Sequence, residues 1–171
     1  MKARFGAVLA LLCAPATASA QVVSTLNPLY QSVKGYIVKS AEEMPAESYS
    51  FKPIGTVRSF GEIVGHLANE NYLMCSTAKG EKNPRDGEDF EKTTDKAALV
   101  KALKDAIAYC DPLYGMPDSA FRGEAELFGM KMGKLAILGA NITHNNEHYG
   151  NFVTYLRMKG LVPPSSQGSG M

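Results

Sequence analysis

The sequence lacks several features that assign a chain quickly to a functional class. No segment approaches the roughly 18 to 20 consecutive apolar residues that a membrane-spanning helix needs. Its three cysteines contain no CxxC pair, the spacing typical of dithiol redox centres. Its 18 lysine and arginine residues are balanced by 17 aspartate and glutamate residues. A concentrated basic surface is therefore not expected, and we predict neither nucleic acid nor an anionic membrane as a partner.

The first 20 residues have the form of a secretory signal peptide. Lys2 and Arg4 precede a short apolar run, and Ala18-Ser19-Ala20 fits the small-residue rule for cleavage. We therefore predict cleavage near Ala20 and a periplasmic or secreted protein. Leucines rather than small residues directly precede Cys13, so the leader lacks the form required for lipid attachment and no membrane anchor is expected.

Cleavage at that point leaves 151 residues, which is near the usual size of one domain. We expect one helical domain over residues 21–164, followed by a flexible tail over residues 165–171 that adds no further structure. Cys75 and Cys110 remain after cleavage, and an oxidising compartment normally bonds such a pair. A disulfide is therefore expected, and it would close a loop of about 35 residues. A reactive cysteine pair is the alternative.

Periodic apolar residues predict a first helix that ends before Pro45. Asn27 is a suitable N-cap and Pro28 suits the first helical position, so the helix is expected to begin there. Residues 45–58 contain two prolines and are expected to form an ordered connector. The predicted inner face of the helix repeats at three- and four-residue steps and consists of Leu29, Val33, Tyr36, Ile37 and Ser40.

A stronger start signal marks a second helix. Ser59 and Glu62 have the spacing of a capping box, in which each side chain accepts a hydrogen bond from the other residue's backbone N–H. The helix is expected to begin directly after Ser59, to end near Gly80 and to carry His66. Cys75 follows His66 by nine residues, which places the two side chains on opposite sides of the helix. We therefore do not expect them to share a site.

Two further helices complete the predicted architecture. Residues 80–93 are charged and contain glycine and proline, so a solvated loop is expected, after which Thr94 or Asp95 can cap a third helix. Residues 115–129 fit either a loop with a short turn or a hairpin. A long fourth helix is expected from Lys131 to Met158. Four helices without a convincing strand pattern predict an all-α four-helix bundle, an architecture that builds metal sites between facing helices.

All three histidines of the chain lie in two short stretches. His144 and His148 are four residues apart, so on a helix they share one face and can reach the same ion. His66 is the only other imidazole available as a ligand. Three neutral imidazoles leave at least one coordination position for water or substrate, which is typical of catalytic rather than structural zinc. A lone histidine on an apolar helix face is more often a hydrogen-bonded core residue, so a bundle without metal is the alternative.

Other polar residues fall near the predicted site. Glu70 lies one turn beyond His66 and is our candidate catalytic residue, since it would orient an imidazole or a bound water; a solvated or helix-pairing carboxylate is the alternative. Asn141 is expected either to contact a ligand or to satisfy a polar core. Glu147 is expected either to have a structural role or to contact a metal-binding histidine without binding the metal itself. Tyr149, Tyr155 and Arg157 are expected to pack and to anchor loops.

The stretch His144-Asn145-Asn146-Glu147-His148 also matches the inverted zinc-peptidase motif, in which Glu147 would be the general base. That motif requires an acidic third ligand far downstream. None of the 23 residues after His148 is aspartate or glutamate. The peptidase interpretation is therefore not favoured.

Three blocks together resemble the DinB superfamily over nearly the whole mature chain. They are Ser59-Phe60-Gly61-Glu62-Ile63-Val64-Gly65-His66, His144-Asn145-Asn146-Glu147-His148-Tyr149-Gly150-Asn151 and Tyr155-Leu156-Arg157-Met158-Lys159-Gly160-Leu161-Val162-Pro163-Pro164. The resemblance implies a four-helix bundle of the DinB/YfiT-like type with a metal site between helices two and four. In that family one histidine on the second helix and an H-x3-H pair on the last hold a divalent metal, commonly zinc or nickel. It thus assigns His66, His144 and His148 as ligands.

The resemblance also implies a function. We expect a divalent-metal-binding protein that acts as a metal-dependent hydrolase or transferase on a small-molecule substrate, and homodimers are frequent in the family. A non-catalytic metal-binding or ligand-binding bundle is the alternative, because the ligand face offers no clear general base.

Overall fold

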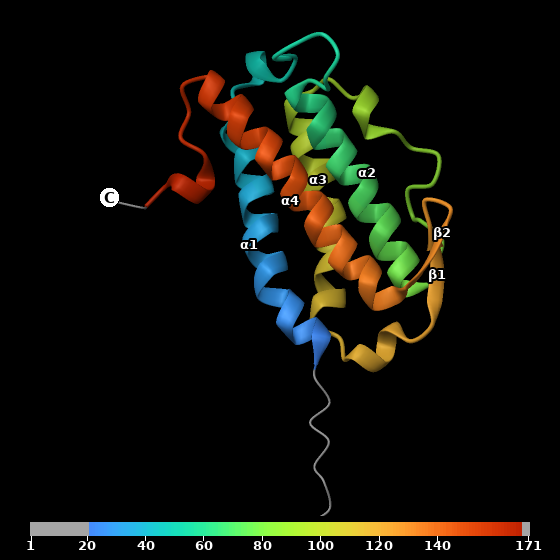
Figure 1. Cartoon of the computed structure of the whole chain (residues 1–171). Helices are drawn as coiled ribbons and strands as arrows, with labels where there is room; N and C mark the ends of the chain where they lie inside the picture. Colours follow the sequence, from blue (N-terminus) through green and yellow to red (C-terminus); the bar gives the residue numbers. More distant parts are fainter. Residues whose placement is uncertain (1–20, 169–171) are drawn as a thin grey trace, which may run out of the picture.

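Four long helices dominate the computed structural model, which describes residues 21–168. They are α1 (Val22–Glu43), α2 (Phe60–Lys79), α3 (Lys96–Cys110) and α4 (Lys134–Met158). Helices α1 and α4 run in one direction and α2 and α3 in the other (Figure 1). Each helix packs against two neighbours, in the cyclic order α1, α4, α2, α3. The predicted four-helix bundle is confirmed.

The parallel direction of α2 and α3 requires a long connection. After α2 ends, residues 80–95 return along the outside of that helix to its starting end, where α3 begins (Figure 1). This segment contains the short 3-10 turn η2 (Phe90–Lys92), which packs against α2. Residues 80–93 are exposed for most of their length, as expected of a solvated loop, but Phe90 and Glu91 of η2 are half-buried against α2.

A small antiparallel hairpin precedes α4. Strands β1 (Glu124–Leu127) and β2 (Met130–Gly133) pair with Leu127 opposite Met130. The two residues between them, Phe128 and Gly129, both have positive φ angles, of 52° and 75°, as a tight two-residue hairpin loop requires. The hairpin occupies the first residues predicted for the fourth helix, so α4 begins at Lys134 rather than Lys131.

Local signals position α2 and α3 as expected. Ser59 accepts a hydrogen bond from the Glu62 N–H, and its own N–H donates to the Glu62 carboxylate at 2.6 Å, which completes the predicted capping box. Gly80 ends α2 in the left-handed conformation, with φ of 78°. The Asp95 side chain caps α3 by accepting the Ala98 N–H at 2.8 Å. Both predicted helices are confirmed.

The predicted start of α1 is wrong. The helix begins at Val22, six residues before Pro28, which lies inside it. Its first free N–H groups, those of Val22 and Val23, donate to the two carboxylate oxygens of Asp118 at 2.8 and 2.9 Å. Asp118 lies 96 residues away from Val22, in the turn η4 (Asp118–Phe121). A cap supplied from so far along the chain leaves no local signal.

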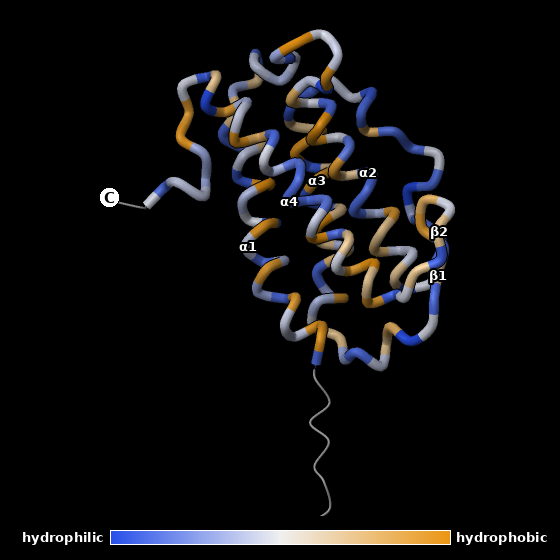
Figure 2. Tube along the Cα trace, viewed as in Figure 1, coloured by the Kyte–Doolittle hydropathy of each residue, from blue (hydrophilic) through white to orange (hydrophobic). Residues whose placement is uncertain are grey.

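A large core fills the space between the helices, a second small cluster of buried residues lies between α2 and α3, and apolar residues recur along each helix (Figure 2). Leu29 was expected to belong to the inner face of α1, yet its side chain is 57 % exposed. The expected disulfide joins Cys75 on α2 to Cys110 on α3. The largest fully buried side chains are Tyr30, Tyr114, Phe60, Phe152, Ile37, Met44, Leu67, Met74, Leu99, Leu103, Leu113 and Ile137.

The chain after α4 continues to pack on the bundle. Residues 164–166 form the 3-10 turn η5, and the Ser165 N–H donates to the Tyr149 hydroxyl at 2.8 Å. The expectation of no further structure after Pro164 is wrong for this part. The predicted signal peptide over residues 1–20 lies outside the described residues. Within residues 21–168, none of the helices combines the length and apolar character needed to cross a membrane.

Candidate metal centre

Three imidazoles meet between α2 and α4. His66 projects from α2, and His144 and His148 project from successive turns of the facing helix. The Nε2 atoms of His66 and His144 are 3.1 Å apart, and one ring nitrogen from each of the three histidines lies within 4.8 Å of the others. Nitrogen ligands bind zinc at about 2.0 to 2.1 Å, so this group could hold one metal ion with small side-chain movements.

A buried amide cluster fixes the register of the two helices. The Asn71 Oδ1 accepts hydrogen bonds from the side-chain amides of Asn141 and Asn145, at 2.9 and 3.1 Å. Its Nδ2 donates to Asn145 Oδ1 and to the Leu67 carbonyl. All three asparagines are fully buried. Because these bonds join α2 to α4, they hold the histidine-bearing turns opposite each other.

The structure therefore decides between the two predicted roles of Asn141. Its side chain also accepts a hydrogen bond from the Tyr114 hydroxyl at 2.8 Å and belongs to the polar core. Tyr155 anchors a loop, as expected, by donating from its hydroxyl to the Arg58 carbonyl at 2.6 Å. Glu147 is exposed at the rim of the site.

A carboxylate that the sequence did not predict supports the first histidine. Glu91 Oε1 lies 2.8 Å from His66 Nδ1. A carboxylate there accepts the Nδ1 proton, which fixes the tautomer and leaves Nε2 as a free lone pair directed toward His144. Glu91 belongs to η2, 25 residues after His66. No local sequence pattern relates the two residues, because the crossover connection brings them together.

Gly65 makes this contact geometrically feasible. A Cβ atom at this position would lie 2.4 Å from the Phe90 carbonyl oxygen, closer than any real contact. One turn along α2, the Asn69 side chain accepts the Phe90 N–H and donates to Asp89. Gly65 and Asn69 together dock η2 on α2, so that Glu91 reaches His66.

The lone pairs needed for a metal are available at neutral pH. The pKa of His144 is lowered to about 4, first by burial and then by the charges of His148 and His66. The pKa of His148 is lowered to about 4, again mainly by burial. Both rings are therefore neutral near pH 7, the form that binds metals.

The hydrogen-bond partner of His148 is a side-chain amide, which can take two orientations. Its Nδ1 lies 3.2 Å from Nδ2 of the Asn151 side-chain amide. That amide can present either its oxygen or its nitrogen. With the oxygen toward the ring it accepts the Nδ1 proton, which leaves Nε2 of His148 free to bind an ion.

Two buried polar atoms near the site lack hydrogen-bond partners among the described residues, Nδ1 of His144 and Oε2 of Glu70. Buried polar atoms are rarely left unpaired unless a ligand, an ion or a water serves them. Burial raises the pKa of Glu70; the charge of His66 opposes this shift, and the charge of Glu91 adds to it. The predicted catalytic candidate is thus a half-buried carboxylate with one free oxygen beside the histidines.

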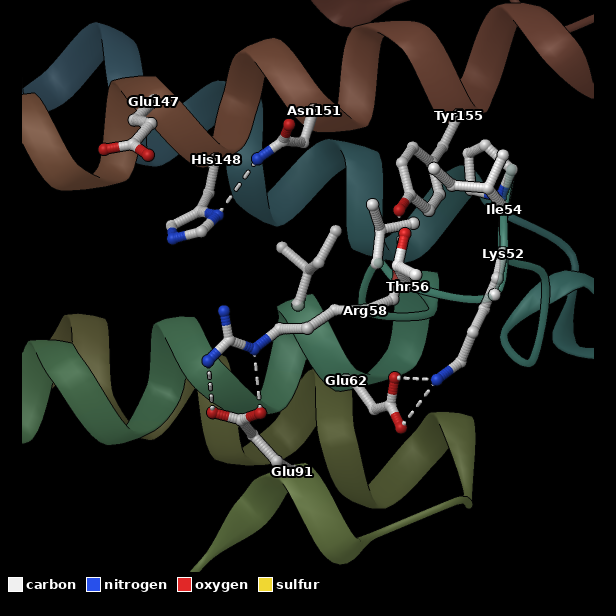
Figure 3. A pocket seen from close by; sticks show the side chains of 14 residues that line it. Lys52, Ile54, Thr56, Arg58, Glu62, Glu91, Glu147, His148, Asn151 and Tyr155 are labelled. Atoms are coloured by element: carbon white, nitrogen blue, oxygen red, sulfur yellow. Dashed lines mark hydrogen bonds and ion pairs between the residues drawn. The ribbon is translucent and has the colours of Figure 1, made fainter.

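An open cleft of about 830 Å³ borders this centre, with His148 and Glu91 in its lining. Figure 3 shows the Arg58 guanidinium lying between the His148 imidazole and the Glu91 carboxylate. Arg58 Nε lies 2.9 Å from Glu91 Oε2. The cleft is lined on one side by the α1–α2 connection, residues 52–58, and on the other by the last three turns of α4, with Glu147, His148, Asn151 and Tyr155.

Comparisons with known proteins agree with this architecture. The sequence model of the DinB superfamily matches residues 31–151. The Bacillus subtilis protein YjoA is 29 % identical over 125 residues, which cover 70 % of this chain and 79 % of YjoA.

Two solved structures share the fold. A DinB-like protein from Bacillus cereus superposes with a TM-score of 0.67 at 19 % identity, covering 80 % of this chain and 93 % of that one. The YjoA structure gives a TM-score of 0.63 at 24 % identity, with coverages of 80 % and 92 %.

Proposed function

The chain belongs to the DinB superfamily, and we propose that it is a divalent-metal-dependent enzyme, a hydrolase or transferase of small molecules. His66, His144 and His148 would hold the ion. The observation that carries the proposal is the convergence of three imidazoles, two of them neutral at pH 7, with His148 lining an open cleft. Imidazole ligands suit zinc and nickel, the ions we propose.

Each neighbouring residue has a distinct task in this proposal. When bound, a divalent ion supplies Lewis acidity and lowers the pKa of a bound water or thiol. Glu91 orients His66, and Asn151 orients His148. Glu70 has an unpaired oxygen and a raised pKa, which suit a residue that accepts a proton from the nucleophile.

Metal analysis tests the binding step. Purified protein loaded with zinc or nickel should retain about one ion per chain after dialysis, measured by plasma mass spectrometry. The double variant His144→Ala, His148→Ala should retain none. Asn146→Ala, an exposed change between the two histidines, should retain the ion. Equal metal content in the wild type and the double variant would overturn the proposal.

Turnover distinguishes an enzyme from a passive metal-binding bundle. Hydrolytic and thiol-transfer substrates should be screened with the metal-loaded protein. Glu70→Gln should keep its ion and lose about 10²- to 10⁴-fold in rate, the usual contribution of a general base. Full activity in Glu70→Gln would remove this residue from the mechanism. No metal-dependent turnover in the screen would favour the non-catalytic alternative.

We also propose that the protein functions outside the cytoplasm. The Cys75–Cys110 disulfide supports this location, because such bonds persist mainly in oxidising compartments. Mass measurement of the exported protein should give a chain that begins at Gln21. A mature chain that retains residues 1–20 would contradict the proposal.

A further inference from the structure

We infer that the cleft binds a small carboxylate with an apolar body, in which Arg58 takes the carboxylate and the exposed side chains of Ile54 and Val57 take the apolar part. This inference deepens the proposed function and rests on it. It names the class of substrate that would reach the three histidines.

Arg58 is held with part of its guanidinium free. Glu91 engages the Nε at 2.9 Å, and its second oxygen is 3.5 Å from Nη2, at the limit of a hydrogen bond. The Tyr155 hydroxyl fixes the Arg58 backbone from the opposite wall of the cleft. In Figure 3 the remaining nitrogen of the guanidinium points toward His148. A donor pre-positioned in this way can bind an anionic oxygen without first ordering its side chain.

The charge of the cleft favours an anion once a metal is present. Its lining contains two cationic side chains, Lys52 and Arg58, and three carboxylates, Glu62, Glu91 and Glu147. The protein alone therefore contributes one net negative charge. A divalent cation on neutral histidines changes this balance to one net positive charge. The metal-loaded cleft should thus attract an anion that the metal-free cleft does not.

The small number of free cationic groups favours a carboxylate over a phosphate. Lys52, the other cation of the cleft, is already paired with Glu62 at 2.9 Å. Arg58 is thus the cation with a free edge in the lining. One guanidinium edge matches the two oxygens of a carboxylate, whereas a phosphate presents more charge and more acceptor oxygens than this edge can satisfy.

Apolar side chains cover the wall of the cleft next to Arg58. Ile54 is 61 % exposed and Val57 is 37 % exposed, and both line the cleft. They lie on the α1–α2 connection within four residues of Arg58. Exposed aliphatic side chains at the entrance of a polar site are suited to the hydrocarbon part of a ligand whose charged end lies deeper.

Octanoate and its neutral analogue octanamide provide a direct test. The zinc-loaded, ¹⁵N-labelled protein is titrated with each probe, and the Arg58 Nε–H and backbone resonances are followed by NMR. Octanoate should bind at least about tenfold more tightly than octanamide, and Arg58→Gln should abolish the difference. Lys52→Gln is the matched control, because it removes an equal charge from the same cleft, and it should preserve the difference. Ile54→Ser should weaken octanoate without changing acetate.

The outcomes separate the two proposals. Loss of metal binding in the wild type would defeat the proposed function itself. Retained zinc with equal binding of octanoate and octanamide would defeat only the carboxylate inference, as would tighter binding of inorganic phosphate than of octanoate. Arg58→Gln must keep its zinc content and melting temperature, so that a lost preference reports on the guanidinium. Octanoate binding of equal strength in the metal-free protein would contradict the charge argument.

Discussion

At the scale of single residues, the arrangement of the three histidines depends on side chains outside the cluster. Glu91 lies within hydrogen-bond distance of His66, and the absence of a side chain at Gly65 lets Glu91 come this close. The side-chain amide of Asn151 lies next to His148 Nδ1. Supporting partners of this kind set the tautomer and direction of a ligand ring. Their removal should therefore be measurable in metal affinity.

Replacing Glu91 with glutamine should weaken zinc binding by about 10- to 100-fold, the usual effect of losing a supporting carboxylate. The amide keeps the size of the side chain but removes the negative charge that favours a protonated Nδ1 on His66. Competition with a chromogenic chelator measures the affinity. Glu88→Gln is the control, because Glu88 is exposed and pairs with Arg85 instead. Unchanged zinc affinity in Glu91→Gln would show that the carboxylate is not needed.

Gly65→Ala should destabilise the protein by about 1 to 3 kcal/mol, as overpacking of a tight contact usually does. The new methyl group would meet the backbone of Phe90, so η2 must move away from α2 and Glu91 from His66. Urea unfolding and the same zinc competition measure both effects. Gly139→Ala, in α4, has free space around its Cβ and should instead stabilise the helix by about 0.5 to 1 kcal/mol.

At the scale of elements, the register between α2 and α4 depends on the buried asparagines. Asn71→Leu should cost at least about 2 kcal/mol, because it leaves buried N–H groups of Asn141 and Asn145 without their acceptor. Equilibrium unfolding measures the loss. Asn146→Leu changes an exposed residue of α4 and should shift stability by less than about 0.5 kcal/mol. Equal effects of the two changes would show that the amide cluster contributes nothing.

Elements that carry their own signals were predictable from the sequence. The capping box at Ser59, the stop at Gly80 and the cap at Asp95 each act within a few residues, and the structure has all three. The i,i+4 spacing of His144 and His148 also identified a shared face. The start of α1 was missed because Asp118 caps it from a distant turn. Glu91 was missed for the same physical reason, since only the crossover places it beside His66.

At the scale of the whole molecule, the burial of two histidines links stability to pH. Their pKa values of about 4 in the folded state lie below the value of about 6.5 expected in the unfolded chain. The unfolded state therefore binds protons first as the pH falls. The metal-free protein should lose stability between about pH 6.5 and pH 4, with each histidine contributing at most about 1.4 kcal/mol per pH unit.

Thermal unfolding of the metal-free protein at several pH values measures this slope. The variant His144→Asn, His148→Asn lacks both titrating groups and should show a shallower dependence between pH 6.5 and pH 4. Saturating zinc binds only the neutral rings and should raise the melting temperature most near pH 7. If the melting temperatures of the wild type and the double variant depended on pH in the same way, His144 and His148 would not be the groups that link stability to pH.

The disulfide closes a covalent ring between residues 75 and 110, and the crossover segment with Glu91 lies inside that ring. Reducing the disulfide would remove this constraint from the segment whose Glu91 lies beside the His66 imidazole. A reducing agent should therefore lower zinc affinity before it unfolds the bundle. We therefore expect the oxidation state of Cys75 and Cys110 to set part of the zinc affinity of a site on the opposite side of α2.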